Sequence, residues 1–96
     1  MITPIVKTSG SAYTVQLTDY TVFCDVALSS PTVTLPSAAA NSGRIFVIRR
    51  VGSGNNQCNV TPVQGGTVAL DNSSSTPRAI QVQSDGTTWW LIAQSQ

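Results

Sequence analysis

The sequence contains no histidine and no glutamate, and charged residues make up only 9% of its 96 residues. Most enzymes depend on a side chain that titrates or binds a metal near neutral pH, and histidine is the usual one. The residues left for such chemistry are four aspartates and two cysteines. We therefore expect a protein that is not an enzyme and needs no cofactor, and that holds other molecules rather than transforming them.

Long apolar runs and strong charge are also missing. No segment approaches the roughly 18 consecutive apolar residues of a membrane span. The first residues lack the basic stretch and long apolar run of a secretory signal. A net charge of +1 gives no electrostatic basis for nucleic-acid binding. We expect a mature, soluble chain that contacts neither a membrane nor nucleic acid.

The two cysteines, Cys24 and Cys58, allow one disulfide or none. Because no secretory signal is recognised and cytosolic thiols stay reduced, we expect two free, buried thiols, with a disulfide as the alternative. A nucleophilic cysteine is poorly supported, since no histidine is present to act as its base.

Short apolar and polar alternations separated by turn residues predict an all-β fold. The expected strands are residues 12–18, 20–26, 32–35, 44–51, 57–61, 67–70, 79–83 and 88–93. Asp85-Gly86 between the last two predicts a hairpin, and residues 37–43 allow a short helical turn that Gly43 ends. We expect one small antiparallel β-sandwich or barrel-like domain of about eight short strands over residues 11–96.

Residues 1–10 differ from the rest, because Ile2, Ile5 and Val6 are apolar while Pro4 disrupts regular strand pairing. One interpretation is a frayed end or an edge strand. The other is an N-terminal arm that docks on a neighbouring subunit or on a larger partner.

Three further residues are candidates for contacts between subunits. The segment 44–51 has apolar residues on both faces, which indicates burial inside a sandwich or against another subunit. We assign Phe46 and Ile48 to such packing. Successive strand residues point to opposite faces, so one indole of Trp89-Trp90 can enter the core while Trp90 contacts a subunit or ligand. Burial of both indoles is the alternative.

The charged residues suggest no metal or catalytic site. Arg44, Arg49 and Arg50 lie on one predicted strand, where they are either solvated or paired with aspartate. Contact with an acidic partner surface is the alternative. Asp25 falls within a strand, where it could pair with an arginine. The other aspartates fall at predicted turns, and none has the spacing of a calcium loop.

Several segments follow one another in an order that resembles a known group. They are Tyr13-Thr-Val, Asp19-Tyr20-Thr-Val, Val33-Thr-Leu-Pro36 with the Ala-Ala-Ala-Asn-Ser-Gly-Arg44 that follows, Ile48-Arg-Arg, Asn59-Val-Thr-Pro62, and Ser84-Asp-Gly-Thr87 followed by Trp89. In this order they resemble a small β-domain of tailed-bacteriophage virion proteins, which occurs in tail and head fibres and in capsid decoration proteins. The resemblance spans roughly residues 13–92. It implies a non-enzymatic, β-sandwich-like module that acts as a homotrimer.

We therefore expect a bacteriophage capsid decoration (cement) protein, made in the host cytoplasm and located on the capsid surface of the virion. Copies would associate through Phe46, Ile48 and Trp90. Ile2, Ile5 and Val6 would dock on the lattice of the major capsid protein and stabilise the head. The alternative is a receptor- or glycan-binding domain of a tail or head fibre, with Trp90 against host sugar. The lack of a collagen-like or coiled-coil shaft favours the decoration protein.

Overall fold

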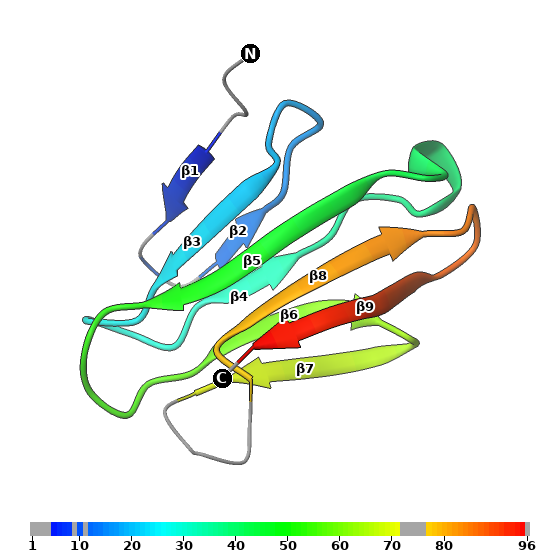
Figure 1. The fold of residues 1–96 in the computed structure, drawn as a ribbon. Coiled ribbons are helices and arrows are strands. Elements are labelled where there is room, and N and C mark those ends of the chain that lie inside the picture. The colour runs from blue at the N-terminus through cyan, green and yellow to red at the C-terminus, as the bar shows by residue number, and fades with distance from the viewer. Residues whose placement is uncertain (1–4, 9, 11, 72–76, 96) are drawn as a thin grey trace.

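The structure is a computed structural model that describes residues 5–8, 10, 12–71 and 77–95. These residues form nine strands in two facing sheets, which do not close into a barrel (Figure 1). The larger sheet contains, in spatial order, β1 (Ile5–Thr8), β3 (Thr21–Asp25), β5 (Ile45–Val51), β8 (Ala79–Ser84) and β9 (Trp89–Ser95). The smaller sheet contains β2 (Ala12–Thr14), β4 (Thr32–Thr34), β6 (Cys58–Val63) and β7 (Gly66–Leu70).

The first six strands alternate between the two sheets. Strands β1, β3 and β5 pair in parallel in the larger sheet, and β2, β4 and β6 do so in the smaller sheet. Two successive strands of one sheet run the same way because the chain returns through the other sheet between them. The last three strands make antiparallel pairs. The prediction of mainly antiparallel pairing is therefore wrong, whereas the all-β, sandwich-like class is confirmed.

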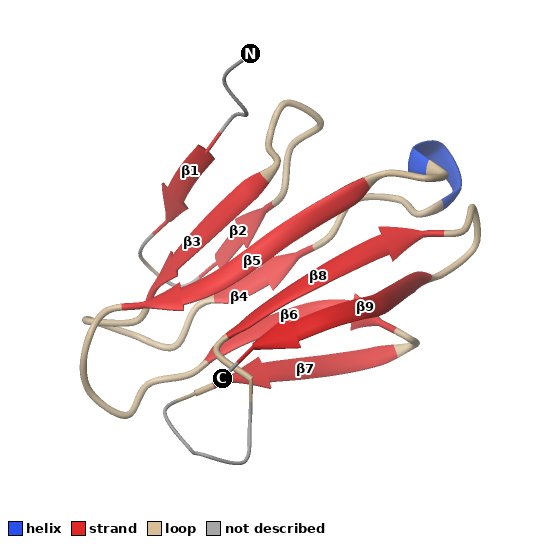
Figure 2. Cartoon of the chain, viewed as in Figure 1, coloured by secondary structure: helices blue, strands red, loops and turns tan. Residues whose placement is uncertain are grey.

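All eight predicted strands are present, with ends that differ by a few residues. The structure has one strand more than predicted. This strand, β1, lies at an edge of the larger sheet, inside the segment that we interpreted as either an arm or an edge strand. The predicted hairpin joins β8 to β9. The predicted helical turn is η1, a 3-10 helix at Ala39–Asn41, shown in blue in Figure 2.

The core lies between the two sheets, where every second residue of the central strands points inward. It contains Val15, Val22, Cys24, Val26, Val33, Leu35, Phe46, Ile48, Cys58, Val60, Val63, Leu70, Ile80, Val82 and Trp89. Trp89 packs against Phe46 with ring centroids 5.4 Å apart. Its indole N–H donates to the carbonyl of Pro36 at 2.8 Å, so the buried ring has a partner for its only donor.

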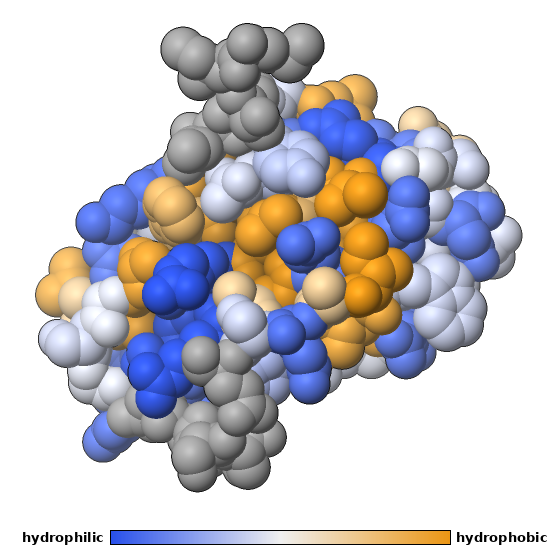
Figure 3. All heavy atoms as spheres, viewed as in Figure 1, coloured by the Kyte–Doolittle hydropathy of each residue, from blue (hydrophilic) through white to orange (hydrophobic). Residues whose placement is uncertain are grey.

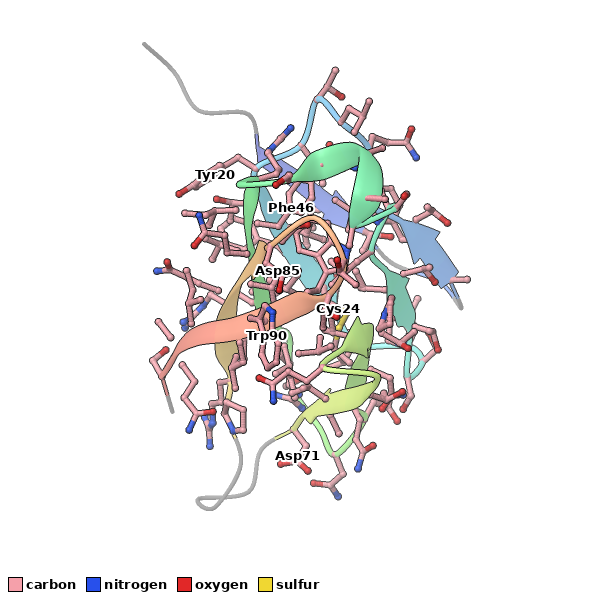
Figure 4. All side chains as sticks on the ribbon, turned by 90° about the vertical axis from the view of Figure 1, so that its right-hand side faces the viewer. Tyr20, Cys24, Phe46, Asp71, Asp85 and Trp90 are labelled. Atoms are coloured by element: carbon pink, nitrogen blue, oxygen red, sulfur yellow. A yellow bond between two sulfur atoms is a disulfide. The ribbon has the colours of Figure 1, made fainter. Side chains whose placement is uncertain are left out.

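Cys24 and Cys58 are bonded to each other, so the expectation of two free thiols is wrong. The disulfide is yellow in Figure 4. Cys24 on β3 and Cys58 on β6 both face the core, with their Cα atoms 6.2 Å apart, a separation that a disulfide spans. They are 34 residues apart in sequence, and no local pattern shows that these two strands face each other.

Candidate functional site

The outer face of the larger sheet is the candidate functional site. Its side chains alternate with the buried ones and point away from the core. The outer face includes Lys7, Thr21, Phe23, Asp25, Ile45, Val47, Arg49, Val51, Ala79, Gln81, Gln83, Trp90 and Ala93. In the described part of the chain, no element covers it. Figure 3 shows this side of the molecule, where orange apolar residues fill the centre among fewer blue polar ones.

Three strands supply the apolar side chains of this face. Phe23 of β3 and Val47 of β5 are half-buried, and Trp90 of β9 is 45% exposed. Ile92 is 46% exposed and lies at an irregularity of the pairing, where Val82 pairs with Leu91 and the preceding residue of β8 pairs with Ala93. Such a bulge re-aims side chains at a sheet edge. Tyr20, just before β3, projects on the same side (Figure 4).

Trp90 is held in place by the hairpin that precedes β9. Its indole N–H donates to Asp85 Oδ2 at 2.8 Å. Oδ1 of the same carboxylate accepts the backbone N–H groups of Thr87 and Thr88, each at 2.8 Å. These hydrogen bonds lower the pKa of Asp85 below its ordinary value, and the bond from Trp90 has the largest effect. The hairpin thus presents an exposed indole in one orientation.

Arg49 lies at the other end of the outer face, at a recess of about 290 Å³. The recess is lined by Thr21, Phe23, Val47, Arg49, Ala79, Ile80, Gln81, Ala93, Gln94 and Ser95. Arg49 is the only charged residue among them. Across the strands it pairs with Phe23 on one side and Ala79 on the other.

The other two arginines of the predicted cluster have structural roles. Arg44 donates to the carbonyls of Leu17 and Asp19 and lies 4.5 Å from the centre of the Phe46 ring. Arg50 is 7% exposed and donates to two backbone carbonyls of the β5–β6 loop. The side chain of Arg49 makes no hydrogen bond or ion pair within the described residues.

The aspartates also hold local structure. The Asp19 side chain accepts the Tyr13 hydroxyl and the Gln16 N–H, as its predicted turn position requires. Burial and this hydrogen bond raise the pKa of Tyr13 to about 12. Asp25 lies 3.7 Å from Lys7 Nζ rather than beside an arginine.

Of the three residues predicted to contact another subunit, the structure buries two and leaves one exposed. Phe46 and Ile48 are fully buried between the two sheets, so neither reaches another subunit and their assignment to a subunit interface is wrong. They point inward because alternate side chains of β5, including these two, face the smaller sheet. Trp90 points outward, and its assignment to an interface stays a prediction.

The predicted docking arm is placed only in part. Ile2 lies outside the described residues. Ile5 belongs to β1, and Val6 on the same strand packs partly against the core. Whether this segment docks on a partner stays a prediction, but the side chain of Val6 also supports the fold.

Sequence reasoning missed Phe23, Val47 and Ile92 as members of the exposed apolar surface. The signal was present for β3 and β5, because each strand carries apolar residues on both faces while the smaller sheet covers only one of them. For Ile92 no signal existed, since the bulge that exposes it depends on pairing with β8.

The described residues contain no group of three or more metal-ligating side chains. In the same part of the chain, no helix has the length and apolar character that a membrane crossing requires. No match to this chain was found among protein-family models, curated proteins or solved structures.

Proposed function

We propose that this chain is a structural protein of a bacteriophage virion, a capsid decoration protein that acts only through contacts with other proteins. Copies associate with one another, as a homotrimer, and the assembly docks on the major capsid protein and stabilises the head. The proposal assigns the chain no catalysis and no cofactor.

One observation carries this proposal: no element of the described chain covers the apolar outer face of the larger sheet. Soluble monomers rarely expose a large contiguous apolar surface, and such surfaces mark sites of protein association. Trp90, at one end of this face, is 45% exposed, and Ile92, at the bulge of the same strand β9, is 46% exposed. Tryptophan is enriched among residues that dominate binding energy. The order of segments that resembles phage virion domains supplies the class of partner.

The Trp90 end of the face is assigned to contacts between copies. The indole of Trp90 is already oriented by Asp85, so little side-chain freedom is lost when a second copy covers it. Multivalent docking then follows, because a trimer that has made one contact with a shell makes the next ones within the same complex.

Sedimentation of the purified chain, alone and with shells, tests the proposal. The shells are assembled from a phage major capsid protein, the partner that the proposal names. We expect the wild type to self-associate and to sediment with expanded shells. Trp90→Ser and Ile92→Ser should weaken self-association about tenfold or more.

Leu28→Ser is the matched control, because Leu28 is 90% exposed but lies in the β3–β4 loop, outside the outer face. It removes an exposed apolar side chain without touching the proposed contact and should change nothing. A wild type that stays monomeric at high concentration and does not sediment with shells contradicts the proposal.

A second candidate is a glycan-binding domain of a tail or head fibre. The orientation of Trp90 favours it, since an indole fixed through its N–H keeps a ring face open for stacking. On a glycan array, this function predicts reproducible sugar binding that Trp90→Ala abolishes and Ile92→Ser retains. Sugar binding without shell binding would favour this candidate over the decoration protein.

A further inference from the structure

The recess at Arg49 has the form of a receptor for a side chain. It combines an apolar wall, made by Phe23 and Val47, with a low floor at Ala79 and Ala93, whose side chains are single methyl groups. Its volume of about 290 Å³ is at the small end of the range for ligand sites, and it is suited to one or two side chains. Polar Thr21 and Ser95 lie at its margin.

The guanidinium of Arg49 has no acidic partner within the described chain. Three of the four aspartates are engaged elsewhere, each by a hydrogen bond or ion pair. They are Asp19 with Tyr13, Asp25 with Lys7, and Asp85 with Trp90. None of the four aspartates lines the recess. A group that covers Arg49 must therefore bring its own negative charge, because a covered cation without a partner is strongly unfavourable.

A second copy of this chain does not meet this requirement. It carries the same four aspartates, and each of them already has a partner. A face-to-face pair about a two-fold axis through the recess would also bring two Arg49 side chains together, and like charges in contact disfavour association.

We propose that the Arg49 recess binds a different protein at a point where an apolar side chain stands next to an Asp or Glu carboxylate. The apolar side chain enters the recess over Ala79 and Ala93 and packs against the wall made by Phe23 and Val47. The carboxylate pairs with the Arg49 guanidinium, which presents donors in a fork that matches a carboxylate. This inference rests on the proposed function, in which the assembly docks on a capsid protein. It assigns the Arg49 end of the outer face to that docking and names the chemistry of the contact.

The pair supplies specificity. At the surface, the guanidinium is solvated, so pairing it adds little. Once a partner covers the recess and removes water, a carboxylate at that point is favoured, and an uncharged amide leaves the cation without compensation. The recess therefore distinguishes a partner with Asp from one with Asn, because the partner with Asp binds more tightly.

Two short peptides test the recess without a shell: acetyl-Thr-Leu-Asp-Thr-amide and its Asn counterpart. They are titrated into the ¹⁵N-labelled full chain, and backbone amide shifts are followed at Val47, Arg49, Gln81 and Ala93. We expect saturable shifts at these amides, with the Asp peptide binding at least about fivefold more tightly than the Asn peptide. Raising the salt concentration should reduce this preference.

Arg49→Gln should lower the affinity for the Asp peptide until it equals the affinity for the Asn peptide. Lys7→Gln is the matched control, since Lys7 supplies the same charge two strands away in the same cross-strand row but is paired with Asp25; it should keep the preference. A version extended by Gly-Ser-Gly after Gln96 moves any terminal carboxylate away from Ser95 and should behave as the original. Equal affinities for the two peptides, or shifts elsewhere only, overturn the inference.

Concentration-dependent shifts at the same amides without peptide would place a second copy in the recess and would also overturn it. Shell sedimentation separates this inference from the proposed function. If wild type and Arg49→Gln sediment equally well, the inference fails and the function stands. If neither sediments while the Asp peptide is still preferred, the function fails and the recess stands.

Discussion

Cys24 of β3 and Cys58 of β6 form a disulfide that joins the two sheets through the core. Both residues are fully buried, and the bond closes a loop that contains β4 and β5. Packing of the buried side chains also holds the two sheets together. The bond therefore fixes how one sheet lies on the other.

Replacing both cysteines by alanine should lower the free energy of unfolding by about 4 kcal/mol. The disulfide stabilises the fold because it restricts the conformations available to the unfolded chain between two residues that are 34 positions apart. Urea denaturation of the wild type and the double variant measures the loss. A reductant added to the wild type should produce a similar decrease and leave the variant unchanged. If the urea midpoint of the wild type stays the same after the disulfide has been reduced in the denatured chain, the predicted loss of stability is wrong.

Arg50 and Arg49 are neighbours in the chain with opposite roles, and their alanine variants should differ accordingly. Arg50→Ala removes charge-assisted bonds to the carbonyls of Asn56 and Gly54 and should lower the unfolding free energy by about 2–4 kcal/mol. Arg49→Ala should stay within about 0.5 kcal/mol of the wild type. Thermal and urea denaturation of both variants check this, and equal losses would show that the β5–β6 loop does not depend on Arg50.

Much of the secondary structure was predictable because turn residues separate the strands. Asp85 and Gly86 mark the β8–β9 hairpin, and the alternation around Cys24 and Cys58 correctly predicts that both face the core. These signals are local. They depend only on which residues tolerate a turn and on which side of a strand each residue lies.

The sheet order was not predictable, because a turn residue does not say which sheet the next strand joins. Asp19 makes its predicted turn, yet the strands on either side of it enter different sheets. The same uncertainty led to the assignment of Phe46 to a subunit interface. Alternation divides β5 into two apolar faces, but only the position of the smaller sheet decides which one is buried.

The recess at Arg49 was predictable only as one of several alternatives. Contact with an acidic partner was considered for three arginines together. The structure separates them, because Arg44 and Arg50 bond to loop carbonyls while Arg49 faces outward. The carbonyls that Arg44 binds lie far away in the sequence, whereas those that Arg50 binds lie in the loop that directly follows β5. No spacing on the strand indicates which guanidinium these loops take.

Val6 should matter for folding more than its place in a candidate docking arm indicates. Val6→Asp puts a charge where the side chain packs on the core, and it should lower the unfolding free energy by about 2–4 kcal/mol. Lys7→Gln, which alters the 64% exposed neighbour, should lower it by no more than about 1 kcal/mol. Urea denaturation compares the two variants.

This difference decides how the docking arm is tested. Loss of shell binding in Val6→Asp would not distinguish a lost contact from a weakened fold. Ile2→Asp is the better variant, with sedimentation against shells as the measurement. The arm hypothesis predicts lost binding with an unchanged urea midpoint, and unchanged binding would remove it.

The hydrogen bond from Tyr13 to Asp19 predicts how stability changes at alkaline pH. Burial, together with the bond to Asp19, raises the pKa of Tyr13 to about 12 in the folded chain, whereas unfolded tyrosine titrates near 10. Below pH 10 both states keep the proton and the bond contributes fully to stability. Between about pH 10 and 12 the unfolded state releases the proton first, so this contribution falls as the pH rises and is lost above the folded pKa.

Tyr13→Phe should therefore be less stable than the wild type at pH 8, and the difference should shrink steadily above pH 10. Urea denaturation of both proteins across this range measures it, and the subtraction removes all other titrating groups. Tyrosinate absorbance of the wild type minus that of the variant gives the pKa directly. A gap in stability that stays constant to pH 11.5 or widens would show that the Tyr13 hydroxyl does not keep its proton through Asp19.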